Sequence, residues 1–300
     1  MASVFDAMKK AQAEQSAQQS ASLSTAEPMS VAAPAGETKQ SRQSAAAAEP
    51  SAIAPAADKP AAADAAHAPM RASAPVPTNN YSPLLQAHHD RGGTVAEQFR
   101  HVRTSLTAQY PDQRFALLVT SAETGEGKTV STGNLGVIMA ERQDRTTLIV
   151  DCDMRRSKLT ALFHAQNSPG MVDLLKGSAT LQQCIQPTVY PNLFIIAAGQ
   201  GTREEISELI SRPELEEVVG QLRRQFDYVL VDSPPVNSVA DAGVLGRAVG
   251  EALMIVRMNK TNKESVERAV RLLKAANVKV AGLVLTHQKY FVPNYLYRYS

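Results

Sequence analysis

The chain has 300 residues, a formal net charge of +2 at pH 7 and a hydrophobic content of 44%. So small a net charge argues against nucleic acid as a partner, and two cysteines, Cys152 and Cys184, provide neither a disulfide framework nor a metal-ligand pattern. The longest apolar stretches fall far short of the roughly 20 residues that span a bilayer, so the sequence predicts a soluble, intracellular protein.

The first 90 residues predict two segments outside the folded domain. Residues 1–20 favour a short amphipathic helix, either without a partner or acting as a docking peptide, because apolar residues share one helical face at Val4, Phe5, Met8 and Ala11. About one third of residues 1–80 are Ala, and most of the others are small or polar. Such a composition cannot bury enough apolar surface to fold. We therefore expect residues 21–90 to form a disordered linker, so that a disordered arm precedes the domain.

Residues 91–286 show the alternation of strand and helix patterns that is typical of an α/β domain. A helical pattern begins at Thr94, and six short apolar runs follow it, at 115–121, 147–151, 192–197, 228–232, 252–258 and 278–286. Several runs are apolar on both faces, as buried parallel strands are, and helical patterns separate most of them. Right-handed βαβ units then predict a doubly wound, mostly parallel sheet.

The first apolar run leads into Ala-Glu-Thr-Gly-Glu-Gly-Lys-Thr at 122–129, which an apolar helical pattern follows. This pattern predicts a P-loop, with Ala122 in place of the first glycine, and hence the fold of a P-loop nucleoside triphosphatase. Backbone N–H groups of such a loop bind phosphates, while Lys128 supplies a cation and the Thr129 hydroxyl suits Mg²⁺. The residues predicted to bind the nucleotide are Glu123, Thr124, Gly125, Glu126, Gly127, Lys128, Thr129 and Val130.

Three carboxylates stand where two other predicted strands end. Asp151 is the last residue of the second apolar run, and Asp153 lies two residues beyond it. Asp232 is the last residue of the fourth run. Because the carboxyl ends of parallel strands face the ligand crevice, these carboxylates should converge on the P-loop. We expect Thr129, Asp153 and Asp232 to hold Mg²⁺, which needs only one or two carboxylates, so that another can accept a proton. The predicted catalytic residues are Lys128, Asp151 and Asp153, and the sequence leaves open which aspartate is the base.

The motifs at 122–129, 148–155 and 228–235 resemble the Walker A, Walker A′ and Walker B boxes of the bacterial tyrosine kinases, and the resemblance covers about residues 90–300. Related ATPases that position division sites carry a signature lysine where this chain has Glu123, which favours the kinase branch. The resemblance implies an ATP- and Mg²⁺-dependent protein-tyrosine autokinase that regulates exopolysaccharide or capsule polymerisation and export.

Two further motifs are similar to the same family. Glu97, Arg100 and Arg103 match its Glu-x-x-Arg-x-x-Arg box, which implies a ring-like homo-oligomer. By helical spacing these side chains flank the apolar stripe, so we expect them to be free to meet another protein. The tail, residues 287–300, resembles the family's C-terminal tyrosine cluster, which implies autophosphorylation at Tyr290, Tyr295, Tyr297 and Tyr299.

The chain also departs from the family pattern. Thr286 stands where the family often has an asparagine near the adenine, and the arm lacks the transmembrane hairpin of kinases fused to their activator. The resemblance therefore implies a separate membrane-embedded polysaccharide co-polymerase as activator and a cognate tyrosine phosphatase. It also implies a cytoplasmic kinase recruited to the inner face of the plasma membrane.

Two other functions share the same nucleotide residues. One is an ATPase switch of the partitioning type, which does not explain the tyrosine cluster. The other is a nucleotide-dependent scaffold, which leaves the three carboxylates without a catalytic role.

Overall fold

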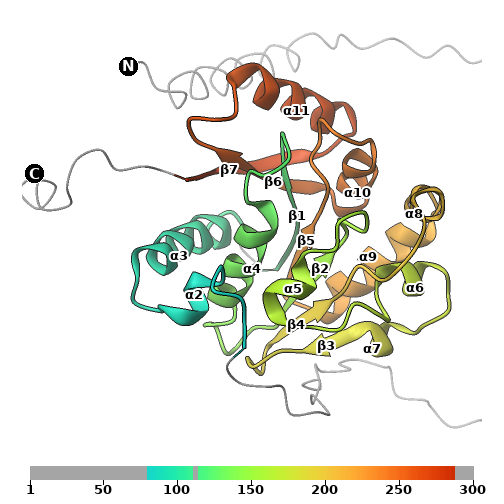
Figure 1. Cartoon of the computed structure of the whole chain (residues 1–300), viewed down its shortest axis with the longest axis horizontal. Helices are drawn as coiled ribbons and strands as arrows, with labels where there is room; N and C mark the ends of the chain where they lie inside the picture. The colour runs from blue at the N-terminus through green and yellow to red at the C-terminus, as the bar shows by residue number, and fades with distance from the viewer. Residues whose placement is uncertain (1–79, 111–113, 288–300) are drawn as a thin grey trace, which may run out of the picture. The chain divides into compact units, whose positions relative to one another are not determined.

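The structure, a computed structural model, describes residues 80–110 and 114–287. These all lie in the second of the two units into which the chain divides, residues 1–62 and 63–300. Seven strands form one sheet in the order β3-β4-β2-β5-β1-β6-β7 (Figure 1). The strands are β1 (Phe115–Ser121), β2 (Thr147–Asp151), β3 (Ile185–Pro187), β4 (Leu193–Ile196), β5 (Tyr228–Asp232), β6 (Glu251–Arg257) and β7 (Lys279–Thr286).

The sheet confirms the predicted doubly wound α/β fold. Every neighbouring pair of strands is parallel except β3 and β4. Each of the six predicted apolar runs forms a strand, with boundaries within a residue or two of those expected. Strand β3 was not predicted, because it is a three-residue antiparallel edge that ends in Pro187, and proline is typical of sheet edges.

Helices cover both faces of the sheet because successive side chains of each buried strand point to opposite faces. Leu117 and Ile149 pack on one face, and Leu118 and Val150 pack on the other. The first face is covered by α2 (Gln86–His89), α3 (Thr94–Thr107), α4 (Lys128–Met139) and α5 (Leu159–Phe163). The hydrophobic core on the second face includes side chains from α6 (Met171–Leu175), α7 (Leu181–Cys184), α8 (Arg203–Ile210), α9 (Glu214–Gln225), α10 (Asp241–Val249) and α11 (Lys263–Ala275).

Helix α4, which follows the P-loop, is buried on nearly all sides, and two glycines make this possible. A Cβ atom on Gly136 would lie 2.3 Å from Cδ1 of Ile149 in β2. A Cβ atom on Gly133 would lie 2.8 Å from Cδ2 of Leu85, in the segment before α2. The missing side chains let α4 contact both the sheet and that segment closely.

The folded region begins earlier than the predicted linker boundary at residue 90. Tyr81 and Leu85 are buried, and the side chain of Asn134 in α4 binds the backbone beside them. Asn134 Oδ1 accepts a hydrogen bond from Ala87 N–H at 2.8 Å, and Nδ2 donates one to Leu84 O at 2.9 Å. The boundary was placed too late because two buried side chains in a polar stretch leave no periodic pattern. The expected helix at 1–20 and the linker up to residue 79 lie outside the described residues.

Candidate active site

The loop 122–127 connects the end of β1 to the start of α4 at the carboxyl edge of the sheet. Gly125 and Gly127 have φ angles of 83° and 92°, in the left-handed region where residues with a side chain are strained. Because α4 begins at Lys128, the free backbone N–H groups of its first turn lie at the loop. The loop therefore has the phosphate-binding conformation that the motif predicts.

A cavity of about 160 Å³ lies beside this loop. Most of the residues predicted to bind the nucleotide line it, namely Thr124, Gly125, Gly127, Lys128, Thr129 and Val130. The predicted residues Glu123 and Glu126 do not line it. Glu123 Oε1 accepts hydrogen bonds from Ser265 Oγ at 3.0 Å and Asn237 Nδ2 at 3.3 Å, and Glu126 is buried. The structure thus separates these two glutamates from the other residues of the predicted set.

The three predicted carboxylates meet the P-loop at the ends of β2 and β5. Asp151 lies opposite Asp232 in the parallel register of these strands, and both are fully buried. Asp153, two residues beyond Asp151, pairs through Oδ2 with Lys128 Nζ at 2.7 Å. The predicted catalytic lysine and aspartates therefore share one site.

Asp151 is held by the backbone of the turn between β2 and α5. Its Oδ1 accepts a hydrogen bond from Asp153 N–H at 3.1 Å, and its Oδ2 accepts one from Leu159 N–H at 3.2 Å. Burial, followed by the neighbouring Asp232 carboxylate, raises the pKa of Asp151 well above its usual range. Asp151 thus combines a structural contact with surroundings that favour its protonated form.

Asp232 has the features of a metal ligand. Burial raises the pKa of Asp232 to about 6, although Lys128 and the Thr129 hydroxyl both act to lower it. Its Oδ2 has no hydrogen-bond partner within residues 80–110 and 114–287. A buried, unpartnered carboxylate oxygen beside a P-loop hydroxyl suits Mg²⁺, which takes few protein ligands and completes its shell with phosphates and water. In the described part of the chain no cluster of three or more His, Cys, Asp or Glu could hold a metal by itself, so Thr129 and Asp232 fit this shared arrangement best.

Two cations that the sequence analysis did not single out, Arg156 and Lys158, also line the phosphate cavity. Both are exposed, and within the described ranges neither side chain forms an ion pair or a side-chain hydrogen bond. The preceding Arg155 is instead bound to Asp241 at 2.7 Å. The signal for this pair was the basic stretch Arg-Arg-Ser-Lys at 155–158, which directly follows the motif that contains Asp151 and Asp153.

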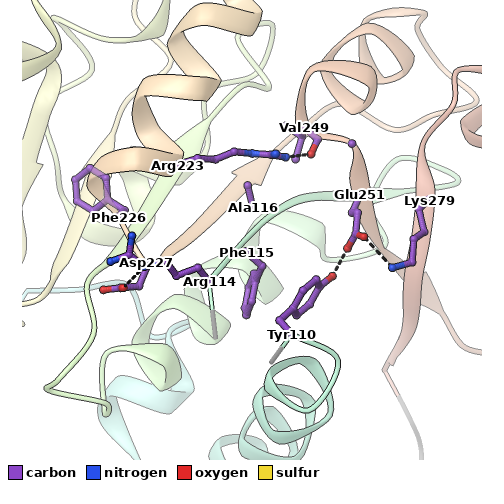
Figure 2. Close-up of a pocket in the computed structure, with 11 residues that line it drawn as sticks. Tyr110, Arg114, Phe115, Ala116, Arg223, Phe226, Asp227, Val249, Glu251 and Lys279 are labelled. Atoms are coloured by element: carbon purple, nitrogen blue, oxygen red, sulfur yellow. Dashed lines mark hydrogen bonds and ion pairs between the residues drawn. The ribbon is translucent and has the colours of Figure 1, made fainter. Parts of the chain in front are cut away.

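A larger cavity, of about 480 Å³, lies at the opposite, amino edge of the sheet (Figure 2). Four of its charged side chains pair with one another, Lys279 with Glu251 at 2.8 Å and Arg114 with Asp227 at 3.0 Å, and Arg223 donates a hydrogen bond to Val249 O. No predicted catalytic residue lines it, and the P-loop does not reach it. The phosphate chemistry therefore belongs to the smaller cavity at the carboxyl edge.

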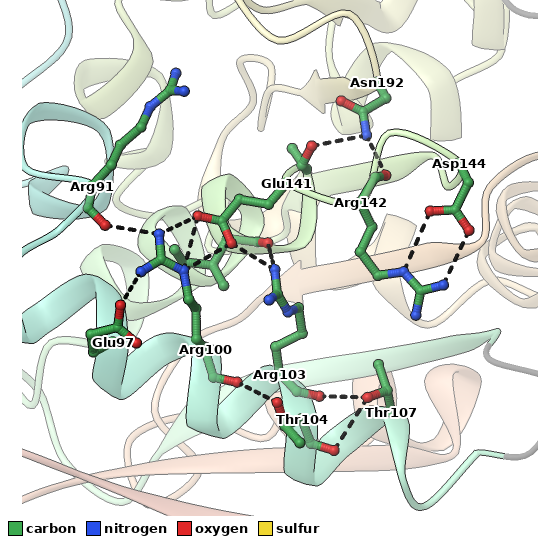
Figure 3. Close-up of polar contacts among 12 residues, drawn as sticks. Arg91, Glu97, Arg100, Arg103, Thr104, Thr107, Glu141, Arg142, Asp144 and Asn192 are labelled. Atoms are coloured by element: carbon green, nitrogen blue, oxygen red, sulfur yellow. Dashed lines mark hydrogen bonds and ion pairs between the residues drawn. The ribbon is translucent and has the colours of Figure 1, made fainter.

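The charged face of α3 is bound within the chain, contrary to the expectation that it is free (Figure 3). Arg100 Nη2 and Arg103 Nη1 pair with the two carboxylate oxygens of Glu141, just beyond α4, at 2.5 and 2.8 Å. Arg100 also pairs with Glu97 at 2.5 Å. The hydrogen bond from Arg100 is the largest cause that lowers the pKa of Glu141. The prediction missed Glu141 because it lies 38 residues from Arg103 in the sequence.

Strand β7 ends beside the P-loop, since Thr286 Oγ1 donates a hydrogen bond of 2.8 Å to Glu126 O. The chain therefore leaves the sheet at the edge that carries the candidate active site. The four tyrosines of the predicted tail, Tyr290, Tyr295, Tyr297 and Tyr299, lie outside the described residues.

Comparison with known proteins agrees with this geometry. A family model described as an AAA domain matches residues 117–277. CapB of Staphylococcus aureus, whose name assigns it to the tyrosine-protein kinases, is 32% identical over 202 residues, which are 67% of this chain and 88% of CapB. Several other curated relatives are much longer, and this chain spans as little as 25% of their length.

Solved structures show the same similarity. The kinase domain of the Escherichia coli tyrosine kinase ETK matches with a TM-score of 0.63 at 28% identity, covering 70% of this chain and 83% of that one. A chimerical protein named CapA2B2 matches with a TM-score of 0.65 at 28% identity, covering 70% of this chain and 92% of the chimera. Among the residues that the structure describes, no helix combines the length and the hydropathy needed to cross a bilayer.

Proposed function

This chain belongs to the bacterial tyrosine-protein kinases, and from that premise we propose that it is an ATP-dependent tyrosine autokinase that regulates exopolysaccharide or capsule polymerisation and export. The observation that carries the proposal is the ion pair of Lys128 with Asp153, close to the buried Asp232, at a P-loop that lies beside the end of β7. The substrate is a tyrosine hydroxyl of the tail, and the product is phosphotyrosine with ADP.

Most of the catalysis comes from charge neutralisation and positioning, as is general in phosphoryl transfer. The P-loop N–H groups and Lys128 bind the β- and γ-phosphates, and Arg156 and Lys158, which also line the cavity, add positive charge. Thr129 and Asp232 would hold Mg²⁺, with Asp153 next to them. The bound metal would offset the charge of the triphosphate.

The tyrosine proton passes to Asp151 or Asp153. Burial and the neighbouring Asp232 raise the pKa of Asp151, so that Asp151 binds a proton more readily than an ordinary carboxylate, whereas Asp153 has an oxygen that pairs with Lys128. Asp151→Asn and Asp153→Asn separate the two roles. The variant that lacks the base loses phosphotyrosine formation while it still binds a fluorescent ADP analogue with wild-type affinity.

We place the kinase in the cytoplasm, where a membrane-embedded activator of the polysaccharide co-polymerase type recruits it to the plasma membrane. A tyrosine phosphatase reverses its phosphorylation. The similarity to the CapA2B2 chimera supports a CapA-type partner. Glu97, Arg100 and Arg103 would then contribute to a ring of identical subunits.

The direct test is an assay of the purified chain with ATP and Mg²⁺, with and without the cytoplasmic segment of such an activator. Phosphotyrosine and released phosphate are both measured. Phosphotyrosine that requires Lys128 supports the autokinase. Released phosphate without phosphotyrosine would indicate an ATPase switch, and nucleotide binding with neither product would indicate a scaffold.

A further inference from the structure

Glu126 is a buried carboxylate inside the phosphate-binding loop. Its side chain is directed away from the phosphate cavity, toward the end of β6. Its Oε2 accepts a hydrogen bond from Glu123 N–H at 2.6 Å. Its Oε1 accepts one from Arg257 N–H at 3.2 Å and another from the Thr261 hydroxyl. One side chain therefore joins the start of the P-loop to the connection between β6 and α11.

The backbone of the same loop is fastened to the neighbouring strands. The carbonyl of Glu126 accepts the hydrogen bond from Thr286, the last residue of β7. Arg257 Nη1 donates a hydrogen bond to Gly125 O at 3.4 Å, and Met258 N–H donates one to Thr286 O at 3.0 Å. The loop, the end of β6 and the end of β7 thus form one hydrogen-bonded unit.

The charge of Glu126 gives this arrangement its significance. The residue is only 2% exposed, and no Lys, Arg or His in the described ranges forms an ion pair with it. Burying a carboxylate without a cation is costly unless hydrogen bonds satisfy its oxygens, and a further negative charge in a triphosphate site is unfavourable. Since all three donors to this side chain are neutral groups of the loop and of the β6–α11 connection, its contacts serve to fix the loop.

We propose that Glu126 is a positioning residue for phosphoryl transfer, which holds the loop 123–127 against the ends of β6 and β7 so that its N–H groups and Lys128 are preorganised for the triphosphate. This rests on the proposed function only in that the loop must bind nucleotide. Preorganised donors lose less freedom on binding, so loosening the loop weakens nucleotide binding before it affects the fold.

Glu126→Gln is the sharpest variant because it keeps the size of the side chain. If the amide oxygen retains the bonds of Arg257 and Thr261, the amide nitrogen faces the N–H of Glu123, and that contact is lost. Thr261→Val removes a single hydroxyl donor and leaves the carboxylate in place. Glu264→Gln removes the same charge from an exposed position on the first turn of α11 and is the matched control.

The experiment measures the affinity of the full chain for a fluorescent N-methylanthraniloyl ADP, the KM and kcat for ATP, and the unfolding temperature without nucleotide. We expect Glu126→Gln to weaken ADP binding and to raise KM at least tenfold, and Thr261→Val to do both by a smaller factor. Glu264→Gln should match the wild type in all three measurements. A variant with merely a smaller folded fraction would lose kcat at an unchanged KM.

Wild-type affinity and KM in folded Glu126→Gln would overturn the proposal. If that variant fails to fold, unchanged values in Thr261→Val overturn it equally. Failure of the kinase assignment is distinguishable, because ADP binding is measured without any phosphotyrosine. A wild-type chain that binds ADP and forms no phosphotyrosine would overturn the proposed function and still test the role of Glu126.

Discussion

At the scale of single residues, Lys128 has two roles that a motif alone does not reveal. It faces the phosphate cavity, and it pairs with Asp153, whose side chain is only 5% exposed. From the sequence one expects a P-loop lysine to contact nucleotide only, so that its loss leaves the fold unaffected. The ion pair changes that expectation.

Lys128→Met should abolish phosphotyrosine formation and also lower the stability of the domain, because it leaves the buried Asp153 carboxylate without its partner. Breaking such a pair costs on the order of 3 kcal/mol. Urea unfolding without nucleotide measures the loss. Lys128→Met with Asp153→Asn should recover most of the lost stability, and a double variant as unstable as the single one would show that the pair is not the cause.

The raised pKa of Asp232 makes a second prediction, about pH. A carboxyl whose pKa rises from 3.8 in the unfolded chain to about 6 in the folded one stabilises the fold fully below pH 3.8, and this contribution is lost as the pH rises through 6. Asp232→Asn stays neutral, so above pH 6 it should be more stable than the wild type by up to about 3 kcal/mol. Unfolding without Mg²⁺ or nucleotide at pH 5 to 8 tests this, and parallel curves for the two proteins would contradict it.

At the scale of elements, α3 and α4 are joined through Glu141, which binds Arg100 and Arg103 together. The arginines therefore stabilise the packing of α3 in one chain, whatever they do between chains. An experiment on assembly has to separate these two effects.

Arg100→Glu should lower the oligomer mass seen by light scattering in the presence of an activator, because it reverses a charge at the proposed subunit contact. Glu141→Gln is the matched variant, since it weakens the same contacts within the chain and keeps both arginine charges. If Glu141→Gln lowers the mass as much as Arg100→Glu, the effect of Arg100 is on the packing of α3. An unchanged mass in both variants would remove α3 from the subunit contact.

The sequence predicted strands such as β1 correctly, but it did not predict contacts between distant residues such as those of Glu141. The strands that carry the site are buried on both faces, so continuous apolar runs revealed them, and an acidic or Gly-rich motif marked the end of each of β1, β2 and β5. Partners far apart in the sequence, such as Glu141 with Arg103 or Asn134 with Ala87, leave no local pattern, because tertiary packing alone brings them together. The direction of the Glu126 side chain was hidden for the same reason.

At the scale of the whole molecule, the polarity of the parallel sheet places the P-loop and the end of β7 at one edge. Because β7 runs parallel to β6 and β1, it ends beside the P-loop, at Thr286. From Thr286 to Tyr299 an extended chain spans about 43 Å at roughly 3.3 Å per residue, whereas Tyr290 reaches only about 13 Å. In the proposed ring of subunits, the more distant tyrosines would therefore be long enough in reach to meet a neighbouring subunit's site.

Phosphorylation in trans follows as an expected outcome. Lys128→Met protein, which keeps its tail, is mixed with a tail-truncated protein that keeps its active site, together with ATP and Mg²⁺. Phosphotyrosine should form on the Lys128→Met chain and should concentrate at Tyr295, Tyr297 and Tyr299. Peptide mass spectrometry locates it, and its absence in a mixture whose truncated partner binds nucleotide would exclude transfer between subunits.

The two hydrogen bonds of Asn134 have a mechanical consequence. At the start of the described domain, the Tyr81 hydroxyl accepts a hydrogen bond from Val189 N–H and Ser82 N–H donates one to Leu162 O. The next residues, Leu84 and Ala87, are held by α4, the helix that begins with Lys128. A pull on this end of the domain would load the contacts of Tyr81 and Ser82 first and then helix α4, against which Leu85 packs at Gly133. The segment at which the described domain begins is therefore mechanically coupled to the helix that starts at the P-loop lysine.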